Sequence, residues 1–401
     1  MKMDKTFLRD FVLSFFAQFA FSSVYSILIP TIPIYLSTFN AKEAEIGVLV
    51  GALSVSSLII RPFVGRALLK IPEKKFMIAG ASLYVISSIG YLVAIPFWPL
   101  MIVRTLQGIG MAFFSTASFT FIANITPEAH RGQFISYYYL SINFSFALAP
   151  YFGMLLINRF NFTVLFLSCV GLSLGSLVMA IKLRRREPAS LKNHSLQDPP
   201  FLSREALPPA IMAFMVNIIW GAVTAFFPLY ALSHGVANPG LFFVALALTL
   251  ILGRAFGGRI LDIYSREKVM LPCLFAYSIA MLILAFSTTL PMFLLAATIW
   301  GIGNAFLYPM LTVYAMDRVG SSPGPAMGTF TAMADLGSGL GSVIMGIILQ
   351  LTSYTTMFLC LALIGILNFL YFHLFVRKKP QSCPFPAPAC RLPAGRGRGR
   401  G

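Results

Sequence analysis

Residues 61–75 read RPFVGRALLKIPEKK, and residues 254–268 read RAFGGRILDIYSREK, at a constant offset of 193. A second pair of stretches, QGIGMAF (107–113) and WGIGNAF (300–306), matches at the same offset. Self-similarity at a fixed period is the sequence signature of a structural repeat. The sequence therefore predicts that the chain contains the same fold twice.

Composition places this repeated fold in a membrane. Hydrophobic residues make up 58% of the chain, charged residues only 11%, and the mean hydropathy is +0.81, which is incompatible with a soluble domain that has a polar shell. Continuous apolar runs of about 20 residues, the length that crosses a bilayer as a helix, recur along the chain, whereas a barrel needs alternating polarity. We therefore expect an all-α membrane protein with twelve transmembrane helices, near residues 9–37, 46–69, 75–96, 98–125, 131–158, 162–183, 206–233, 239–263, 267–289, 291–317, 325–350 and 354–376.

One long polar connection divides these helices into six plus six. We expect an N-terminal six-helix bundle (1–183), a cytoplasmic linker (184–205), a C-terminal six-helix bundle (206–377) and a tail (378–401). The tail is rich in Pro, Gly and Arg and poor in core-forming residues, so we expect it to be disordered.

The basic residues predict the orientation, because short cytoplasmic loops collect Lys and Arg. With the N-terminus inside, every one of the 30 Lys and Arg residues falls on the inner side except Lys42, Arg104 and Arg159. Both termini are then cytoplasmic. The net charge of +17 is explained as a topology signal, and no nucleic-acid partner is expected. The first apolar run is expected to be an uncleaved helix, and the five cysteines show no disulfide or metal-ligand spacing, so no metal or cofactor is expected.

The two aligned loops resemble a signature of the major facilitator superfamily, G-x-L-x-D-R-x-G-R-K, which lies between the second and third helices. Leu69 stands where the family has an acid, whereas the second copy keeps it as Asp262. Such a loop needs a glycine for close helix packing and charges at the helix ends. The resemblance implies a gate latch, formed here by Gly65, Arg66, Lys70, Lys74, Gly258, Arg259 and Asp262.

The stretch RTLQGIGMAF resembles a second family pattern, R-x-x-Q-G-x-G, through Arg104, Gln107, Gly108 and Gly110. An arginine within a span costs about 2.5–3.5 kcal/mol on insertion scales, so we expect Arg104 to face protein or water. The alternative is that its side chain snorkels to the outer surface.

The stretch SINFSFALAPYFGM resembles, in part, the antiporter signature G-x-x-x-G-P-x-x-G-G, with Pro150 and Gly153 in register. In the family this signature marks exporters of the drug/proton antiporter type, so the resemblance favours export and assigns both residues to gating. The alternative is a packing kink that carries no information on direction.

The apolar stretch TFTAMADLGSGLGSVIMGIILQ (329–350) contains one carboxylate, Asp335. At 1.5 Å per residue it lies about 10–16 Å from the cytoplasmic end of its helix, the most deeply placed acid in the chain. Burial favours the neutral form of a carboxyl group, which lets it bind and release protons near neutral pH. We assign proton coupling to Asp335 and Arg104. The alternative is a protonated or arginine-paired aspartate that only holds helices together.

Polar residues that share helix faces predict a central cavity with aromatic walls and few charges. Such a cavity suits an amphipathic organic molecule, although each polar residue alone can also be a helix–helix contact. The expected substrate-binding residues are Gln18, Tyr25, Tyr139, Asn143, Asn217, Trp220, Trp300 and Asn304.

The sequence thus predicts a proton-coupled exporter of a small amphipathic organic compound that works by alternating access. We expect a monomer in the plasma (inner) membrane of a bacterium, with the substrate, protons and the bilayer as partners. An importer of the same fold, a proton symporter or uniporter for a sugar or small metabolite, is the alternative. A sensor or an intramembrane enzyme is disfavoured because the chain has no H-E-x-x-H motif and no paired intramembrane acids.

Overall fold

The computed structural model describes residues 5–68, 70–94, 97–126, 131–184, 204–263, 266–319 and 323–376. Within these ranges the chain is helical almost throughout, and a short π-helix, η3 (Phe372–Val376), follows the last α-helix. The α-helices are α1 (Lys5–Ser37), α2 (Glu43–Ala67), α3 (Glu73–Val93), α4 (Trp98–Ile125), α5 (Arg131–Arg159), α6 (Phe162–Lys182), α7 (Leu207–Ser233), α8 (Gly240–Ile263), α9 (Arg266–Phe286), α10 (Leu290–Val319), α11 (Pro323–Leu351) and α12 (Tyr354–Tyr371).

Each expected helix is present, and the differences are at the ends. The first helix begins at Lys5 rather than at residue 9, because backbone hydrogen bonds continue through polar residues that an apolar run does not include. The third helix ends at Val93 rather than at residue 96. Pro96 follows closely, and a proline disfavours helical backbone in the residue before it.

Eleven of the helices are long and apolar enough to cross a membrane. In α8 the described side chains end at Arg254, and the apolar part up to that point is Gly240–Arg254. The chain is therefore a multi-pass membrane protein.

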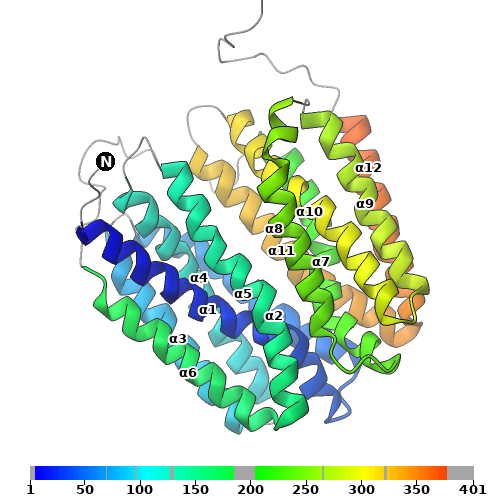
Figure 1. Ribbon diagram of the computed structural model, residues 1–401, viewed down its shortest axis with the longest axis horizontal. Helices are drawn as coiled ribbons and strands as arrows, with labels where there is room; N and C mark the ends of the chain where they lie inside the picture. The colour runs from blue at the N-terminus through cyan, green and yellow to red at the C-terminus, as the bar shows by residue number, and fades with distance from the viewer. Residues whose placement is uncertain are drawn as a thin grey trace, which may run out of the picture.

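Helix contacts recur along the chain. In residues 5–182, α1 packs against α5 and α6, α4 against α2 and α3, and α3 against α6. In residues 207–376, α7 packs against α11 and α12, α10 against α8 and α9, and α9 against α12. The second set of pairs is the first set displaced by six helices. Figure 1 shows α1–α6 on the left of the view and α7–α12 on the right.

Glycine contacts repeat at the level of single residues. Gly108 on α4 packs directly against α2, and Gly301 on α10 packs directly against α8, leaving no room for a Cβ atom at either position. The contacted residues are Leu53 and Ser56 for Gly108, and Leu246 and Thr249 for Gly301. These neighbours differ by the same offset of 193 as the glycines. The offset found in the sequence therefore relates the packing of α4 on α2 to that of α10 on α8.

The early and late helices are joined most extensively by α2 with α11 and by α5 with α8, and also by contacts of α7 with α1 and α2. A Cβ atom on Gly51 would lie 2.7 Å from the carbonyl oxygen of Gly339, and one on Gly240 would lie 2.7 Å from that of Pro150. These approaches lie toward the ends of the helices that meet the α1–α2 and α7–α8 connections. At this end of the molecule, backbones are packed with little space between them.

Several expected features fall outside the described residues. They are Leu69, most of the expected linker (residues 185–203) and the expected disordered tail (378–401).

Candidate functional site

An ion pair joins α2 and α11 deep in the helices. Asp335 Oδ2 lies 2.9 Å from Nε of Arg61, and the two side chains are 21% and 24% exposed. The Nε–H of Arg61 donates to Ser57 Oγ (3.1 Å), and Asp335 Oδ2 is buried without an aligned hydrogen bond. The attraction between Asp335 and Arg61 is therefore mainly one of charge. The positive-inside count assigns Arg61 to the inner side, and the residue lies within α2, as the expected helix 46–69 implies.

Further polar groups surround this pair. Tyr308 on α10 lies within electrostatic range of Asp335, Arg61, Arg254 and Tyr139. Tyr139 on α5 is 46% exposed and packs against Phe119, with ring centroids 4.7 Å apart. We call Arg61, Tyr139, Arg254, Tyr308 and Asp335 the central cluster.

Arg104 is buried in the protein, with 5% of its surface exposed. Its Nε donates to the carbonyl oxygen of Leu49 (3.2 Å), and a terminal nitrogen donates to Oε1 of Gln107 (3.1 Å). The hydroxyl of Tyr91 donates to the same Gln107 oxygen (2.6 Å). This environment contradicts the snorkelling alternative. Among the described residues Arg104 has no carboxylate within ion-pair distance, so it and Asp335 do not form a pair in this conformation.

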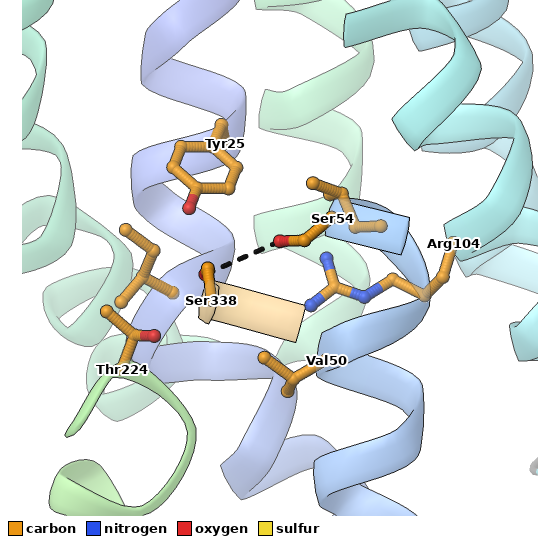
Figure 2. Close-up of a pocket in the computed structure, with 8 residues that line it drawn as sticks. Tyr25, Val50, Ser54, Arg104, Thr224 and Ser338 are labelled. Carbon is orange, nitrogen blue, oxygen red and sulfur yellow. Dashed lines mark hydrogen bonds between the residues drawn. The ribbon is translucent and has the colours of Figure 1, made fainter. Parts of the chain in front are cut away.

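Arg104 borders a small polar cavity formed by helices from both parts of the chain (Figure 2). The cavity has about 20 Å³ of space, room for little more than a water molecule. Figure 2 shows the guanidinium directed toward the hydroxyls of Ser54 and Ser338, which lie 3.4 Å apart. The lining residues are Tyr25, Ile29, Val50, Leu53, Ser54, Arg104, Thr224 and Ser338. In this conformation the cavity does not accommodate an organic substrate.

Gln18, one of the expected substrate-binding residues, is instead buried in a hydrogen-bond network between helices. It is 2% exposed and donates to Ser22 Oγ (2.7 Å). Its Oε1 accepts hydrogen bonds from Ser118 (2.9 Å) and Tyr138 (3.2 Å). Gln18 does not line the cavity in this conformation, contrary to its expected place: its amide holds α1, α4 and α5 together, whereas Tyr25 and Ile29 of the same helix line the cavity.

The two expected tryptophans form an aromatic wall. The rings of Trp220 and Trp300 are 5.7 Å apart, and Phe146 on α5 lies 5.2 Å from Trp220. Trp220 is partly buried, whereas Trp300 is 1% exposed and packs against the ring of Trp220.

The three expected asparagines have different environments. Asn143 Oδ1 accepts from a terminal nitrogen of Arg254 at 3.5 Å, across the α5–α8 contact. The Asn217 amide donates to the carbonyl oxygen of Ala213 in its own helix (2.8 Å), and Asn304 is partly buried on α10. Of the three, only Asn143 is joined to the central cluster.

The first expected latch does not pack as its glycine predicts. A Cβ atom on Gly65 would meet nothing within 4 Å among the residues that the structure describes, so the close packing expected at this glycine is not seen there. Arg66 and Lys70 are exposed, and Lys74 Nζ donates to the carbonyl oxygen of Leu183 (2.6 Å), which ties the start of α3 to the end of α6.

The second expected latch lies in α8, within residues 240–263. The side chains of Gly258, Arg259 and Asp262 are outside the part of the chain that the structure describes.

The partial antiporter signature lies at two helix contacts. A Cβ atom on Gly153 would lie 3.1 Å from the carbonyl oxygen of Ile27, so Gly153 allows α5 to approach α1. Pro150, within α5, makes the close carbonyl contact with Gly240 at the start of α8.

The structure also identifies residues that the sequence did not nominate for this site. Arg61 and Arg254 occupy equivalent repeat positions within helices, a signal available in the aligned stretches but outweighed by the positive-inside interpretation. Ser54 and Ser338 carry no comparable sequence signal. Two acids near helix starts are less exposed than Asp335, which is a different property from its expected depth along a spanning helix. They are Asp10 (0%) and Glu73 (4%), whose Oε1 accepts from Asn124 (2.6 Å).

Comparison with known proteins agrees with this architecture. Residues 14–253 and 235–391 match the model of the Major Facilitator Superfamily. The staphylopine export protein of Staphylococcus aureus strain Mu50 is 27% identical, covering 96% of this chain and 98% of that protein. The quinolone resistance protein NorA of Staphylococcus aureus strain MSSA476 is 24% identical, covering 84% and 88%.

Solved structures share the fold. The nucleoside transporter NupG superposes with a TM-score of 0.75 at 15% identity, covering 94% of this chain and 100% of that one. The xylose transporter XylE from E. coli, in its inward open conformation, gives a TM-score of 0.76 at 16% identity, covering 92% and 96%. Because the family model matches most of its length, this chain belongs to the Major Facilitator Superfamily and is a transporter, not an enzyme.

Proposed function

We propose that this protein is a proton-coupled exporter that moves a small amphipathic organic compound across the membrane by alternating access. The observation that carries the proposal is Asp335, a carboxylate on an apolar helix that faces Arg61 of α2 at 2.9 Å. When Asp335 binds a proton, its charge attraction to Arg61 is lost, so proton binding weakens the α2–α11 contact. Asp335 thereby couples protonation to the relative position of the two helices.

We propose further that residues 1–183 and 206–377 are two six-helix halves, with both termini in the cytoplasm. The displaced helix contacts and the repeated glycine contacts support the division. In this orientation the end closed by Gly51 and Gly240 faces outward, and the conformation has its outer end closed. Substrate release then requires α2 to separate from α11 and α5 from α8 at that end, while the opposite end closes.

Export is favoured over import by the partial antiporter signature and by the names of the relatives, an export protein and a resistance protein. An importer of a sugar or small metabolite is the alternative. NupG and XylE carry a nucleoside and xylose, but identities of 15% and 16% support the shared fold alone. We place the protein, as a monomer, in the plasma membrane of a bacterium.

The test uses energised inside-out vesicles and a dye that reports the proton gradient. A panel of lipophilic cations, aromatic carboxylates, sugars and zwitterions is added to vesicles with the wild type, Asp335→Asn or the exposed control Glu205→Gln. An exported compound collapses the gradient with the wild type and with Glu205→Gln but not with Asp335→Asn. Equal responses with all three proteins contradict the coupling role. Uptake of a compound into cells along the proton gradient establishes import instead.

A further inference from the structure

Arg254 is the repeat equivalent of Arg61, but among the described side chains it has no acid opposite it. It lies on α8 at the offset of 193 from Arg61, and its side chain is partly buried. Whereas Asp335 faces Arg61 across α2–α11, the residue that faces Arg254 across α5–α8 is the neutral Asn143, at 3.5 Å. Among the described residues no carboxylate lies within ion-pair distance of Arg254. Within the part of the chain that the structure describes, one of two equivalent arginines is therefore left without a counter-charge.

Donors without acceptors gather around this arginine. The Nε of Arg254 is buried with no hydrogen-bond partner in the described part of the chain. The hydroxyl of Tyr277 on α9 and the Nε1 of Trp300 on α10 are also buried and lie within interaction range of one another. An indole N–H that donates to the Tyr277 oxygen still leaves the hydroxyl proton of Tyr277 without an acceptor. Tyr277 is 1% exposed and lies within electrostatic range of Arg254, and its ring is 6.1 Å from that of Trp300. Guanidinium and indole N–H groups only donate, and a tyrosine hydroxyl can donate. The missing partner is therefore an acceptor.

The charge balance of the region identifies the acceptor as an anion. Three guanidiniums, those of Arg61, Arg104 and Arg254, lie within the described helices of the central region, and Asp335 is the only described carboxylate paired with any of them. An unpaired charge removed from water is energetically costly. Because folding has already removed much of the water from the arginine, an anionic ligand that binds there gains the Coulomb attraction without desolvating this arginine again. A planar carboxylate matches the two-donor geometry of a guanidinium.

The surroundings also indicate the rest of the ligand. Phe146, from the same helix as Asn143, lies 5.2 Å from Trp220 and 6.0 Å from Phe243 of α8. We propose that Arg254, with Tyr277 and Asn143, binds the carboxylate of the transported compound, and that the apolar body of this compound lies against Trp220 and Phe146. This inference rests on the proposed transport function and names its substrate class, an amphipathic carboxylate.

Equilibrium binding tests the subsite without a proton gradient or transport. The full chain carries Trp98→Phe, which leaves Trp220 and Trp300 as the only tryptophans of the three. The protein is purified in nanodiscs of phosphatidylcholine. Quenching of tryptophan fluorescence is then titrated with 2-naphthoate, its methyl ester and 2-naphthylmethylammonium, which share one ring system and differ in charge.

The expected result is that 2-naphthoate binds about tenfold or more tightly than the ester and the amine, as a charge-assisted hydrogen bond predicts. Arg254→Gln removes this preference and leaves ester affinity unchanged, Arg254→Lys keeps part of it, and Tyr277→Phe weakens naphthoate binding by about threefold. Arg159→Gln, an exposed arginine on α5, leaves all three affinities unchanged. Tyr277→Phe removes a single unpartnered hydroxyl, so it remains informative if Arg254→Gln fails to fold.

Three outcomes overturn the proposal. In the first, 2-naphthoate does not bind or binds no more tightly than the ester. In the second, the preference for 2-naphthoate survives both Arg254→Gln and Tyr277→Phe, and in the third the protein prefers the amine. A further comparison uses nanodiscs that contain phosphatidylglycerol, an anionic lipid. If naphthoate binding is lost in these discs but not in phosphatidylcholine discs, and the loss depends on Arg254, the site binds a lipid headgroup. This outcome also overturns the proposal. If naphthoate binds as expected but no compound of the transport panel collapses the proton gradient, the subsite stands and proton-coupled export fails. If another compound collapses the gradient while the protein binds naphthoate no more tightly than its ester, proton-coupled export stands and the carboxylate subsite fails.

Discussion

Asp335 and Arg61 are separated by most of the chain, yet Asp335 Oδ2 lies 2.9 Å from Arg61 Nε, joining α11 to α2. Because the Arg61 Nε–H is directed to Ser57, the pair has no aligned hydrogen bond through these two atoms that would persist without charge. The contact therefore depends on the ionised form of Asp335, which makes it sensitive to a single proton.

Breaking this pair from either side destabilises the fold. Asp335→Asn leaves Arg61 unpaired, and Arg61→Gln leaves Asp335 unpaired. We expect each to lower the free energy of unfolding by about 1–2 kcal/mol, less than for a fully buried pair because water reaches both side chains. The double variant should recover part of the loss. Reversible unfolding in mixed micelles measures all three, with Glu205→Gln as control, and strictly additive losses would show that the two residues do not interact.

The close approach of α2 and α11 depends on Gly51. In Gly51→Ala the new Cβ atom would lie 2.7 Å from the Gly339 carbonyl oxygen and 2.8 Å from Ser342 Oγ, so the helices must separate. We expect greater labelling of a cysteine at Ser54 by a membrane-impermeant maleimide added outside cells, in a background without the native cysteines. Gly65→Ala is the matched control, because its Cβ atom meets no described atom within 4 Å. Equal labelling in both variants contradicts the closed outer end.

Gln18 is expected to act on stability rather than on substrate choice. Gln18→Ala removes the acceptor shared by Ser118 and Tyr138 and should lower the free energy of unfolding by about 1–3 kcal/mol. Relative transport rates across a compound panel should stay unchanged. Tyr138→Phe removes one donor of the same network and should give a smaller loss. A changed order of preferred compounds in Gln18→Ala would instead return this residue to the binding site.

Arg104 holds α4 to α2 through the Leu49 carbonyl and presents a charge to the cavity of Figure 2. Arg104→Lys keeps the charge but cannot direct separate donors to Leu49 and Gln107. We expect a loss of about 1–3 kcal/mol in stability together with slower transport, and a larger loss in Arg104→Gln. Transport and stability are measured on the same preparations. Wild-type values for Arg104→Gln, matching those of Arg159→Gln, contradict a role for this guanidinium.

The helices were predictable because a spanning segment must be apolar for about 20 residues, which is a local property of the sequence. The ends of α1 and α3 differ from expectation because helix ends depend on backbone hydrogen bonds and on Pro96, which hydropathy does not report. The local motifs around Arg104 and Pro150 likewise predicted membership of a transporter family, and the match to the family model confirms this prediction.

The candidate site was only partly predictable. Asp335, Tyr25 and Asn143 were nominated from depth and helix face, and the structure gives each of them a neighbour from another part of the chain or a place in the cavity. Gln18 lies on the same face of α1 as Tyr25, but its side chain is directed into the contact of α1 with α4 and α5. Spacing fixes the face of one helix and leaves open which neighbours cover it.

The sequence by itself determined a helical membrane protein with an internal repeat at an offset of 193, since composition, run length and self-similarity are properties of the chain alone. Only the tertiary structure decided that Arg61 meets Asp335 while its repeat equivalent Arg254 meets Asn143. The physical reason is that a charge acts over a few ångströms in space, and the residues that come within that distance lie on helices far apart in sequence.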